Sequence, residues 1–244
     1  MAYYLLILKY TFELSISNPL TCLLYFQLVR MTDLKTKSEK TRNRLLITAS
    51  RIFAEKGFQE TTIAEICEQA ETNIASVNYH FRDKETLYLE SWRFAFNQEL
   101  KLYPPEGVLA ADATAEQRLA IRIRSIINRV ADDKSYSFAI INKEMAQPTR
   151  LLSDILEKEI NPQRLQMLDL LKECLGHSAS DKQIHYCHTS IMGQCFQLLR
   201  LKHMQKARHS HNHPNYLNDI QDFADHVVLF SLAGIQAIRS QTLN

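Results

Sequence analysis

Apolar side chains recur every three or four residues along most of this chain, a spacing that places them on one face of a helix. From residue 38 onward, apolar and polar positions do not alternate over any run, so the sequence predicts helices and no strands. Helices are expected at 40–57, 62–69, 74–80, 83–103, 114–131, 136–147, 150–175, 180–207 and 216–239. The expected fold class is therefore all-α, in keeping with only 5 Gly and 6 Pro.

The first three predicted helices are short, and the turn between the second and third is tight. The second begins at Thr62, which forms a capping-box pattern with Glu65, and the third begins at Asn73, a favoured N-cap residue. Asp83 is expected to cap the fourth helix in the same way. Three short helices with this spacing predict a helix-turn-helix, in which the third helix enters the major groove of DNA.

The residue types on the third helix suit that assignment. Ile74, Val77 and Phe81 have helical spacing and are expected to face inward. The residues left for the outer face are Ala75, Ser76, Asn78, Tyr79 and His80. Asn pairs with an adenine edge, a small Ala allows contact with a thymine methyl group, and hydroxyl or ring N–H groups bind phosphate oxygens.

Phosphate contacts are also expected at the starts of two neighbouring helices. Lys84 opens the fourth helix, where backbone N–H groups point outward, and Thr61 and Thr62 lie at the start of the second. An ordinary three-helix bundle with a polar face is the alternative, because several Glu residues offset the Lys and Arg of this region.

The chain divides into three parts by its composition. Residues 1–37 form an N-terminal extension, and translation starting at Met31 is the favoured interpretation of its apolar first thirty residues, over a signal peptide or a membrane span. Residues 38–98 form the helix-turn-helix domain. A Pro-Pro-Glu-Gly break at 104–107 precedes most of the C-terminal part, 99–244.

Charge and candidate chemistry add little to this picture. The net charge is +2, and the five Cys form no C-x-x-C pair, which favours reduced thiols in the cytoplasm. The sequence has no Gly-rich phosphate loop, G-x-S-x-G or H-E-x-x-H motif, so no enzyme is expected. Neither the HSHNHPN run nor His185, Cys187 and His188 has the spacing of a closed metal site, so no metal or cofactor is expected.

The stretch TTIAEICEQAETNIASVNYHFRDKETLY resembles the DNA-binding signature of TetR-family transcriptional regulators. NIASVNYHF, INKEMAQPTRLL and EINPQRLQML resemble the subgroup with a CerR-like C-terminal domain. The resemblance implies that DNA is contacted by Thr72, Asn73, Ala75, Ser76, Asn78, Tyr79 and His80, with Lys84 on phosphate. Glu71 departs from the family pattern, which has Gly at the turn, and a left-handed conformation there costs about 1 kcal/mol without Gly.

The resemblance also implies what the whole protein does. It implies a cytoplasmic, ligand-responsive repressor that binds a palindromic double-stranded DNA operator as a homodimer and is released by a small-molecule effector. The last two long helices are expected to form the dimer interface, and Trp92, Phe96, Glu144 and Met145 to line the ligand pocket. The alternative is a helical protein- or membrane-interaction module that has lost DNA binding.

Overall fold

The computed structural model describes residues 19–107, 112–176, 178–207 and 219–242, and every element in these ranges is a helix. The all-α fold class is therefore confirmed. The elements are α2 (Pro19–Glu60), α3 (Ile63–Gln69), α4 (Ile74–Phe81), α5 (Lys84–Leu102), α6 (Ala115–Ala131), α7 (Tyr136–Ala146), α8 (Leu151–Ile155), the π-helical turn η1 (Leu156–Ile160), α9 (Asn161–Leu175), α10 (Asp181–Ala207) and α11 (Ile220–Thr242).

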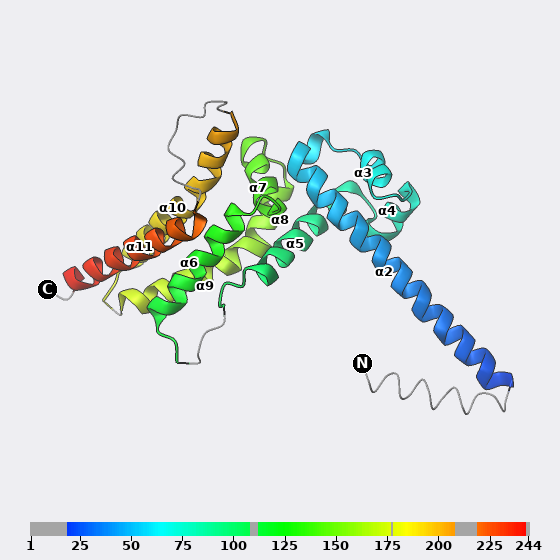
Figure 1. The fold of residues 1–244 in the computed structure, drawn as a ribbon, viewed down its shortest axis with the longest axis horizontal. Helices are drawn as coiled ribbons and strands as arrows, with labels where there is room; N and C mark the ends of the chain where they lie inside the picture. The colour runs from blue at the N-terminus through cyan, green and yellow to red at the C-terminus, as the bar shows by residue number, and fades with distance from the viewer. Residues whose placement is uncertain (1–18, 108–111, 177, 208–218, 243–244) are drawn as a thin grey trace.

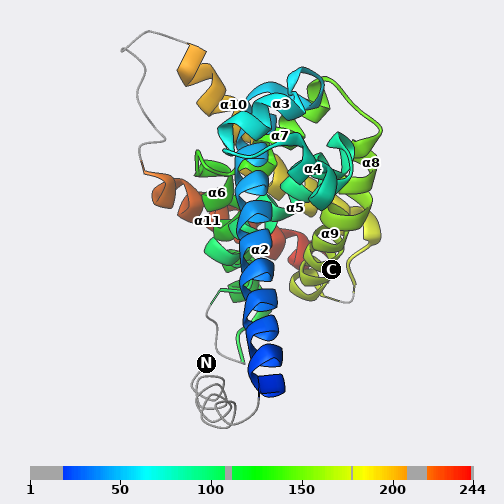
Figure 2. The same cartoon turned by 90° about the vertical axis from the view of Figure 1, so that its right-hand side faces the viewer.

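The helices form two groups joined by α5. At one end, α3 and α4 pack against α2 and the start of α5, and the first part of α2 extends away from the body (Figures 1 and 2). At the other end, α6, α9, α10 and α11 pack against one another (Figure 1). Helix α7 contacts both α2 and α5, so it joins the two groups.

The helix boundaries follow local capping residues, as the sequence predicts. Thr62, Asn73 and Asp83 accept hydrogen bonds from the backbone N–H groups three residues later, at 3.2, 2.9 and 2.7 Å. The predicted capping box at Thr62 is only half present, because the Glu65 carboxylate accepts from Lys56 Nζ at 2.6 Å. Thr114 and Gln117 form a complete box.

Two predicted boundaries need correction. The helix predicted at 40–57 begins at Pro19, so α2 includes part of the predicted N-terminal extension, and its backbone leaves the helical region at Gly57. The last helix ends at Thr242 rather than near Arg239, and its predicted first residues, 216–218, lie outside the described residues. The predicted helix at 150–175 is confirmed as three consecutive segments, with Pro162 in the first turn of α9 directly after η1. A π-turn there is consistent with the missing N–H of proline.

Two apolar cores hold the molecule together. The first contains the apolar stripe of α2, which the helical spacing of the sequence predicts, together with Val77 and Phe81 of α4 and residues of α5. The stripe consists of Leu45, Leu46, Ala49, Ile52 and Phe53. Ile140, Leu151 and Ile155, from α7 and α8, also pack into it. The second core lies among α6, α9, α10 and α11. Because C-terminal side chains complete the first core, the base of the helix-turn-helix and the C-terminal part are packed as one body.

Candidate nucleic-acid interface and ligand cavity

The turn between α3 and α4 sets the orientation of α4. Glu71 has a φ of 50°, the left-handed conformation that the sequence analysis associates with a turn glycine. Its carbonyl oxygen accepts a hydrogen bond from Arg44 Nη2 at 3.4 Å, and Thr72 N donates to Cys67 O at 2.9 Å. The turn therefore forms without glycine, with α2 bonded directly to it.

Asn73 and Ser76 organise the first turn of α4. Asn73 Oδ1 accepts from both Ser76 N, at 2.9 Å, and Ser76 Oγ, at 3.0 Å. The amide nitrogen of Asn73 is left to donate outward, while the Ser76 hydroxyl hydrogen is used inside the protein. This arrangement makes Asn73 the better of the two for contact with a phosphate.

One face of α4 is exposed. It carries Ala75, Asn78 and Tyr79, with 77% of Tyr79 accessible to solvent. Ile74 is 53% exposed, so its predicted inward position is wrong, whereas Val77 and Phe81 are buried as predicted. Positions four apart share a helix face, so Ile74 lies beside Asn78 and adds an apolar group that suits a thymine methyl.

His80 and Thr72 lie at the edges of this face and are half-buried. The His80 ring contacts the Tyr79 ring, with centroids 4.9 Å apart. Burial and the nearby Arg42 guanidinium lower the pKa of His80 from its ordinary value. The imidazole is therefore neutral at pH 7, so it offers a hydrogen bond rather than a positive charge.

The two threonines at the start of α3 differ. Thr61 is only 1% exposed and its hydroxyl donates to Gly57 O at 2.7 Å, so the predicted phosphate contact from its side chain is corrected. Thr62 is exposed, and its hydroxyl oxygen accepts from Glu65 N. Its hydroxyl hydrogen has no acceptor among the described residues, so Thr62 keeps a donor for phosphate.

Lys84 is not extended toward solvent. Its ammonium lies 4.5 Å from the centre of the Phe58 ring and 3.5 Å from Gln59 O, and burial lowers its pKa from the ordinary value. A phosphate contact would require this side chain to leave Phe58. Arg44 and Arg82 are not among the predicted contact residues, although both are exposed near the turn and the end of α4. Their proximity to α4 depends on chain packing, which spacing along the sequence does not show.

The C-terminal half contains an apolar cavity of about 640 Å³. Three of the four predicted pocket residues line it: Trp92, Phe96 and Met145. Glu144 does not, because its buried carboxylate faces the other side of α7 and accepts from the Tyr88 hydroxyl at 2.7 Å. A second cavity of about 210 Å³ shares Phe96, Phe138, Ile160 and Phe196 with the first.

Metal-binding side chains and membrane-spanning helices are two further features that the sequence raised. In the described part of the chain, His, Cys, Asp and Glu side chains form no group of three or more that could hold a metal ion. The HSHNHPN run lies outside the described residues. Across the same described ranges, none of the helices combines the length and apolar character needed to span a membrane.

Comparisons with known proteins agree with this geometry. Residues 45–90 match the family model of bacterial regulatory proteins of the TetR family. The chain is thus a TetR-family DNA-binding transcriptional regulator. Residues 115–235 match the C-terminal domain of the HTH-type transcriptional dual regulator CecR. The C-terminal domain is accordingly CecR-like, and the subgroup expected from the sequence is confirmed.

Individual relatives are similar over most of their length. The HTH-type transcriptional dual regulator CecR of Shigella flexneri is 28% identical over 166 residues, which are 64% of this chain and 74% of that protein. A TetR-like regulator from Rhodococcus sp. RHA1 has a TM-score of 0.58 at 13% identity, covering 80% of this chain and 96% of its own. AibR, in complex with isovaleryl coenzyme A and operator DNA, has a TM-score of 0.54 at 16% identity, covering 78% and 97%. The two structures support the fold.

Proposed function

We propose that this protein is a ligand-responsive repressor that binds a palindromic operator as a homodimer and releases it when a small molecule occupies the C-terminal cavity. The observation that carries the proposal is the exposed face of α4. Asn78 and Tyr79 project from a short helix that is capped by Asn73 and anchored by buried Val77 and Phe81. Exposed side chains on a short, capped helix of this kind suit base-edge and phosphate contacts in a major groove.

The proposed dimer interface lies on α10 and α11. The sequence suggests apolar seams at Ile191, Cys195, Leu198 and Leu199 of α10 and at Phe223, Val227, Phe230 and Ile238 of α11. Ile191, Cys195, Leu198 and Val227 are buried within the chain's own core, whereas Phe230 is exposed. Tyr186 and Leu229 are also large and exposed on these two helices. Gly193 and Gly234 have open space where a Cβ would lie, so a partner helix has room to approach closely. Exposed apolar side chains of this size, grouped on two adjacent helices, favour a two-fold interface.

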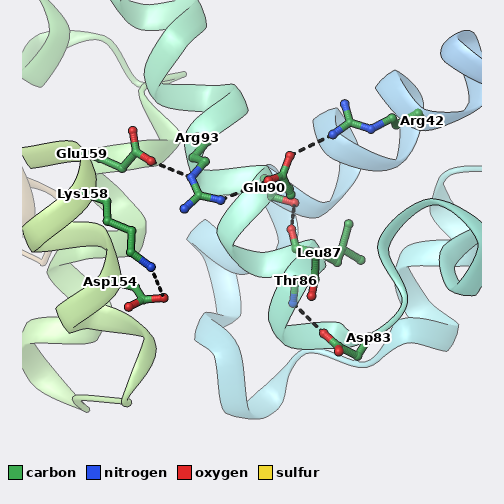
Figure 3. A network of polar contacts seen from close by, with 10 residues as sticks. Arg42, Asp83, Thr86, Leu87, Glu90, Arg93, Asp154, Lys158 and Glu159 are labelled. Atoms are coloured by element: carbon green, nitrogen blue, oxygen red, sulfur yellow. Dashed lines mark hydrogen bonds and ion pairs between the residues drawn. The ribbon is translucent and has the colours of Figure 1, made fainter.

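A chain of ion pairs links the cavity wall to α4. Glu159 lies in η1 between Leu156 and Ile160, which both line the 640 Å³ cavity. Its carboxylate accepts from Arg93 Nε at 2.6 Å, and Arg93 Nη1 donates to Glu90 at 3.1 Å (Figure 3).

The ion pairs continue from α5 to α2, the helix against which α4 packs. Glu90 accepts from Arg42 Nη2 at 2.8 Å (Figure 3). The Arg42 guanidinium lies 5.3 Å from the centre of the Phe81 ring. Phe81 is the last residue of α4. A ligand that moves η1 would therefore act on α4 through α5. Such a ligand releases DNA only if it binds the released conformation more tightly than the DNA-bound one.

Capture of genomic fragments tests the proposed DNA binding. The full chain is expected to enrich a palindromic sequence, and the Asn78→Ala/Tyr79→Ala variant is expected to lose it. Leu102→Ala, at the exposed end of α5, is the matched control and should capture the same fragments. If the wild type enriches no sequence at moderate salt, the repressor proposal fails and an interaction module takes its place.

The dimer interface is tested by charge insertion. Phe230→Glu is expected to yield monomers in sedimentation velocity, because an ionised carboxylate is costly to bury in an apolar contact. Leu102→Glu makes the same change on an exposed residue outside α10 and α11. Dimers that persist in Phe230→Glu at low micromolar concentration would place the interface elsewhere.

The ion-pair chain is tested by removing its central cation. Arg93→Met is expected to weaken operator binding by about two- to thirtyfold, the range measured for residues that couple distant sites. Lys158→Met is the matched control, since Lys158 of η1 pairs with Asp154 of α8 at 3.1 Å (Figure 3). Equal effects from the two variants would argue against a path through Arg93.

A further inference from the structure

Two nitrogens of the Arg129 guanidinium are buried without a hydrogen-bond partner among the described residues. Arg129 lies on α6 and is 7% exposed, and the two nitrogens are its Nε and Nη1. The centres of the Phe96 and Phe138 rings lie 5.6 and 5.5 Å from its Cζ. Aromatic faces attract a cation, but they do not replace two missing hydrogen bonds. A buried charge in this state is costly, so it requires an explanation.

The nearest acidic side chain does not satisfy Arg129. Glu99 is also buried, but its two oxygens accept from Ser137 N at 3.0 Å and Ser137 Oγ at 2.5 Å. Burial lowers the pKa of Arg129 to about 10, while the charge of Glu99 acts in the opposite direction. Arg129 therefore remains protonated at neutral pH. Its charge is partly balanced by Glu99, but its N–H groups are not.

Arg129 faces the 210 Å³ cavity together with a second buried arginine. Arg122 lies seven residues before Arg129 on α6, about two turns away on the same helix face. It is 8% exposed, and its Nη2 lies 3.4 Å from Gln166 Oε1, its one hydrogen bond among the described residues. Arg164 and His188 also line this cavity. No Asp or Glu lines either this cavity or the adjoining 640 Å³ one in the described residues. The lining of the smaller cavity is therefore cationic, with no acidic side chain among the described residues that line it.

The larger cavity is mainly apolar. Trp92, Ile141, Leu156 and Leu199 make most of its wall apolar. Phe96, Phe138, Ile160 and Phe196 belong to both cavities, so one ligand can extend from one into the other. Ligand sites commonly pair a large apolar wall with a few fixed polar groups.

We propose that the effector is an amphipathic anion, with a carboxylate or similar oxyanion bound by Arg129 and Arg122 and an apolar or aromatic body beside Trp92. A guanidinium presents N–H groups in a fork that matches two oxygens of such a group. The anion makes the hydrogen bonds that Arg129 lacks, so binding removes the cost of the unpaired charge. The regulatory role of this ligand rests on the proposed function, whereas the anion site does not depend on DNA binding.

Two fluorescent probes that differ by one charge test the proposal. The probes are 8-anilinonaphthalene-1-sulfonate, which is anionic, and N-phenyl-1-naphthylamine, which has the same rings without the sulfonate. Trp92 is the single Trp of the chain and lines the larger cavity, so energy transfer from it reports binding at this site. Affinity for each probe is measured by titrating the full chain without DNA.

The expected results differ between the probes. Arg129→Met keeps an apolar side chain of similar length, and we expect it to weaken binding of the anionic probe by about ten- to hundredfold, the effect of lost charge-assisted hydrogen bonds. Binding of the neutral probe should stay within about twofold. Arg124→Met, on the same helix but paired with Asp225 outside these cavities, is the matched control and should bind both probes as the wild type does.

Two outcomes would overturn the proposal. One is anionic-probe affinity in Arg129→Met equal to that of the wild type, and the other is no energy transfer from Trp92 to the anionic probe in the wild type. If Arg129→Met does not fold by circular dichroism, Arg122→Met is judged by the same affinities. A positive titration with a failed genomic capture would overturn the repressor function alone, and the reverse result would overturn the anionic effector alone.

Discussion

Two buried ionisable side chains, one bonded to the first core and the other next to the second, have opposite surroundings. Glu144 is 2% exposed and accepts from Tyr88 OH at 2.7 Å, Thr149 N at 2.9 Å and Thr149 Oγ1 at 3.0 Å. Arg129 has Nε and Nη1 without any partner among the described residues. Native proteins rarely leave buried polar groups unsatisfied, so the contrast distinguishes a structural group from one that awaits a ligand.

The packing around these two groups differs in the same way. Around Tyr88, the rings of Phe53 and Phe58 lie 4.8 and 5.2 Å from its ring centre and fill the space. Arg129 lines a cavity of about 210 Å³, which shares part of its aromatic wall with the cavity of about 640 Å³. The packing around Tyr88 is filled by side chains, whereas the region of Arg129 has room for another molecule.

The largest effect is expected on the DNA-reading face. Asn78→Ala/Tyr79→Ala should weaken operator binding on the order of a hundredfold or more, because each good base or phosphate contact contributes about 1–3 kcal/mol. Unfolding by urea should be unchanged, since both side chains are exposed. Electrophoretic mobility shifts at fixed salt measure the affinity. Loss of stability in the variant would mean that this face contributes to packing.

The hydroxyl of Tyr88 is expected to have the next largest effect. Tyr88→Phe removes a buried hydrogen bond to a carboxylate and should lower the free energy of unfolding by about 2 kcal/mol. The control is Tyr186→Phe, at an exposed position, where no change is expected. Chemical denaturation measures both. If Tyr88→Phe leaves the free energy of unfolding unchanged, the contrast between Glu144 and Arg129 is contradicted.

Substitution of Arg129 is expected to change the free energy of unfolding in the opposite direction. Without ligand, Arg129→Met should raise the free energy of unfolding by about 1 kcal/mol, because a buried cation that lacks hydrogen bonds is replaced by an apolar side chain. The same denaturation experiment applies, with Arg124→Met as the control that loses only a surface ion pair. A clear loss of stability would show that Glu99 and the two phenylalanine rings already satisfy Arg129.

The smallest effect is expected from pH, and its sign differs between the two halves. Burial raises the pKa of Glu99, so its protonated form stabilises the fold below about pH 4.3, and this stabilisation is lost as pH rises through the raised pKa. The backbone N–H of Thr86 lowers the pKa of Asp83, so its contribution is present above the unfolded pKa and is lost as pH falls.

Denaturation of Glu99→Gln and Asp83→Asn from pH 3 to pH 8 separates these contributions. Relative to the wild type, Glu99→Gln should gain stability as pH rises through the raised pKa of Glu99. Asp83→Asn should lose stability relative to the wild type as pH rises from the lowered pKa of Asp83 to its unfolded pKa, and the difference should be constant above that. The two difference curves have opposite slopes if the assignments are right. Parallel curves would contradict them.

The sequence predicted the local features of the candidate sites well. The caps at Thr62, Asn73 and Asp83 join groups only three residues apart, so composition and spacing are enough to find them. Errors arose where packing decides exposure. Ile74 has the spacing of an inward residue but is exposed, and Thr61 looks available for phosphate but is buried.

By itself, then, the sequence determined the all-α fold and the helix-turn-helix, because hydrophobic periodicity and capping act over a few residues. Its resemblance to the TetR family, carried by short motifs, was confirmed by the comparisons with known proteins. Only the tertiary structure decided the partners of Glu144 and the isolation of Arg129. Tyr88 lies 56 residues before Glu144, and Phe96 and Phe138 approach Arg129 from two other helices. Contacts over such separations form when whole helices pack, and no local pattern in the chain encodes which polar groups that packing leaves unpaired.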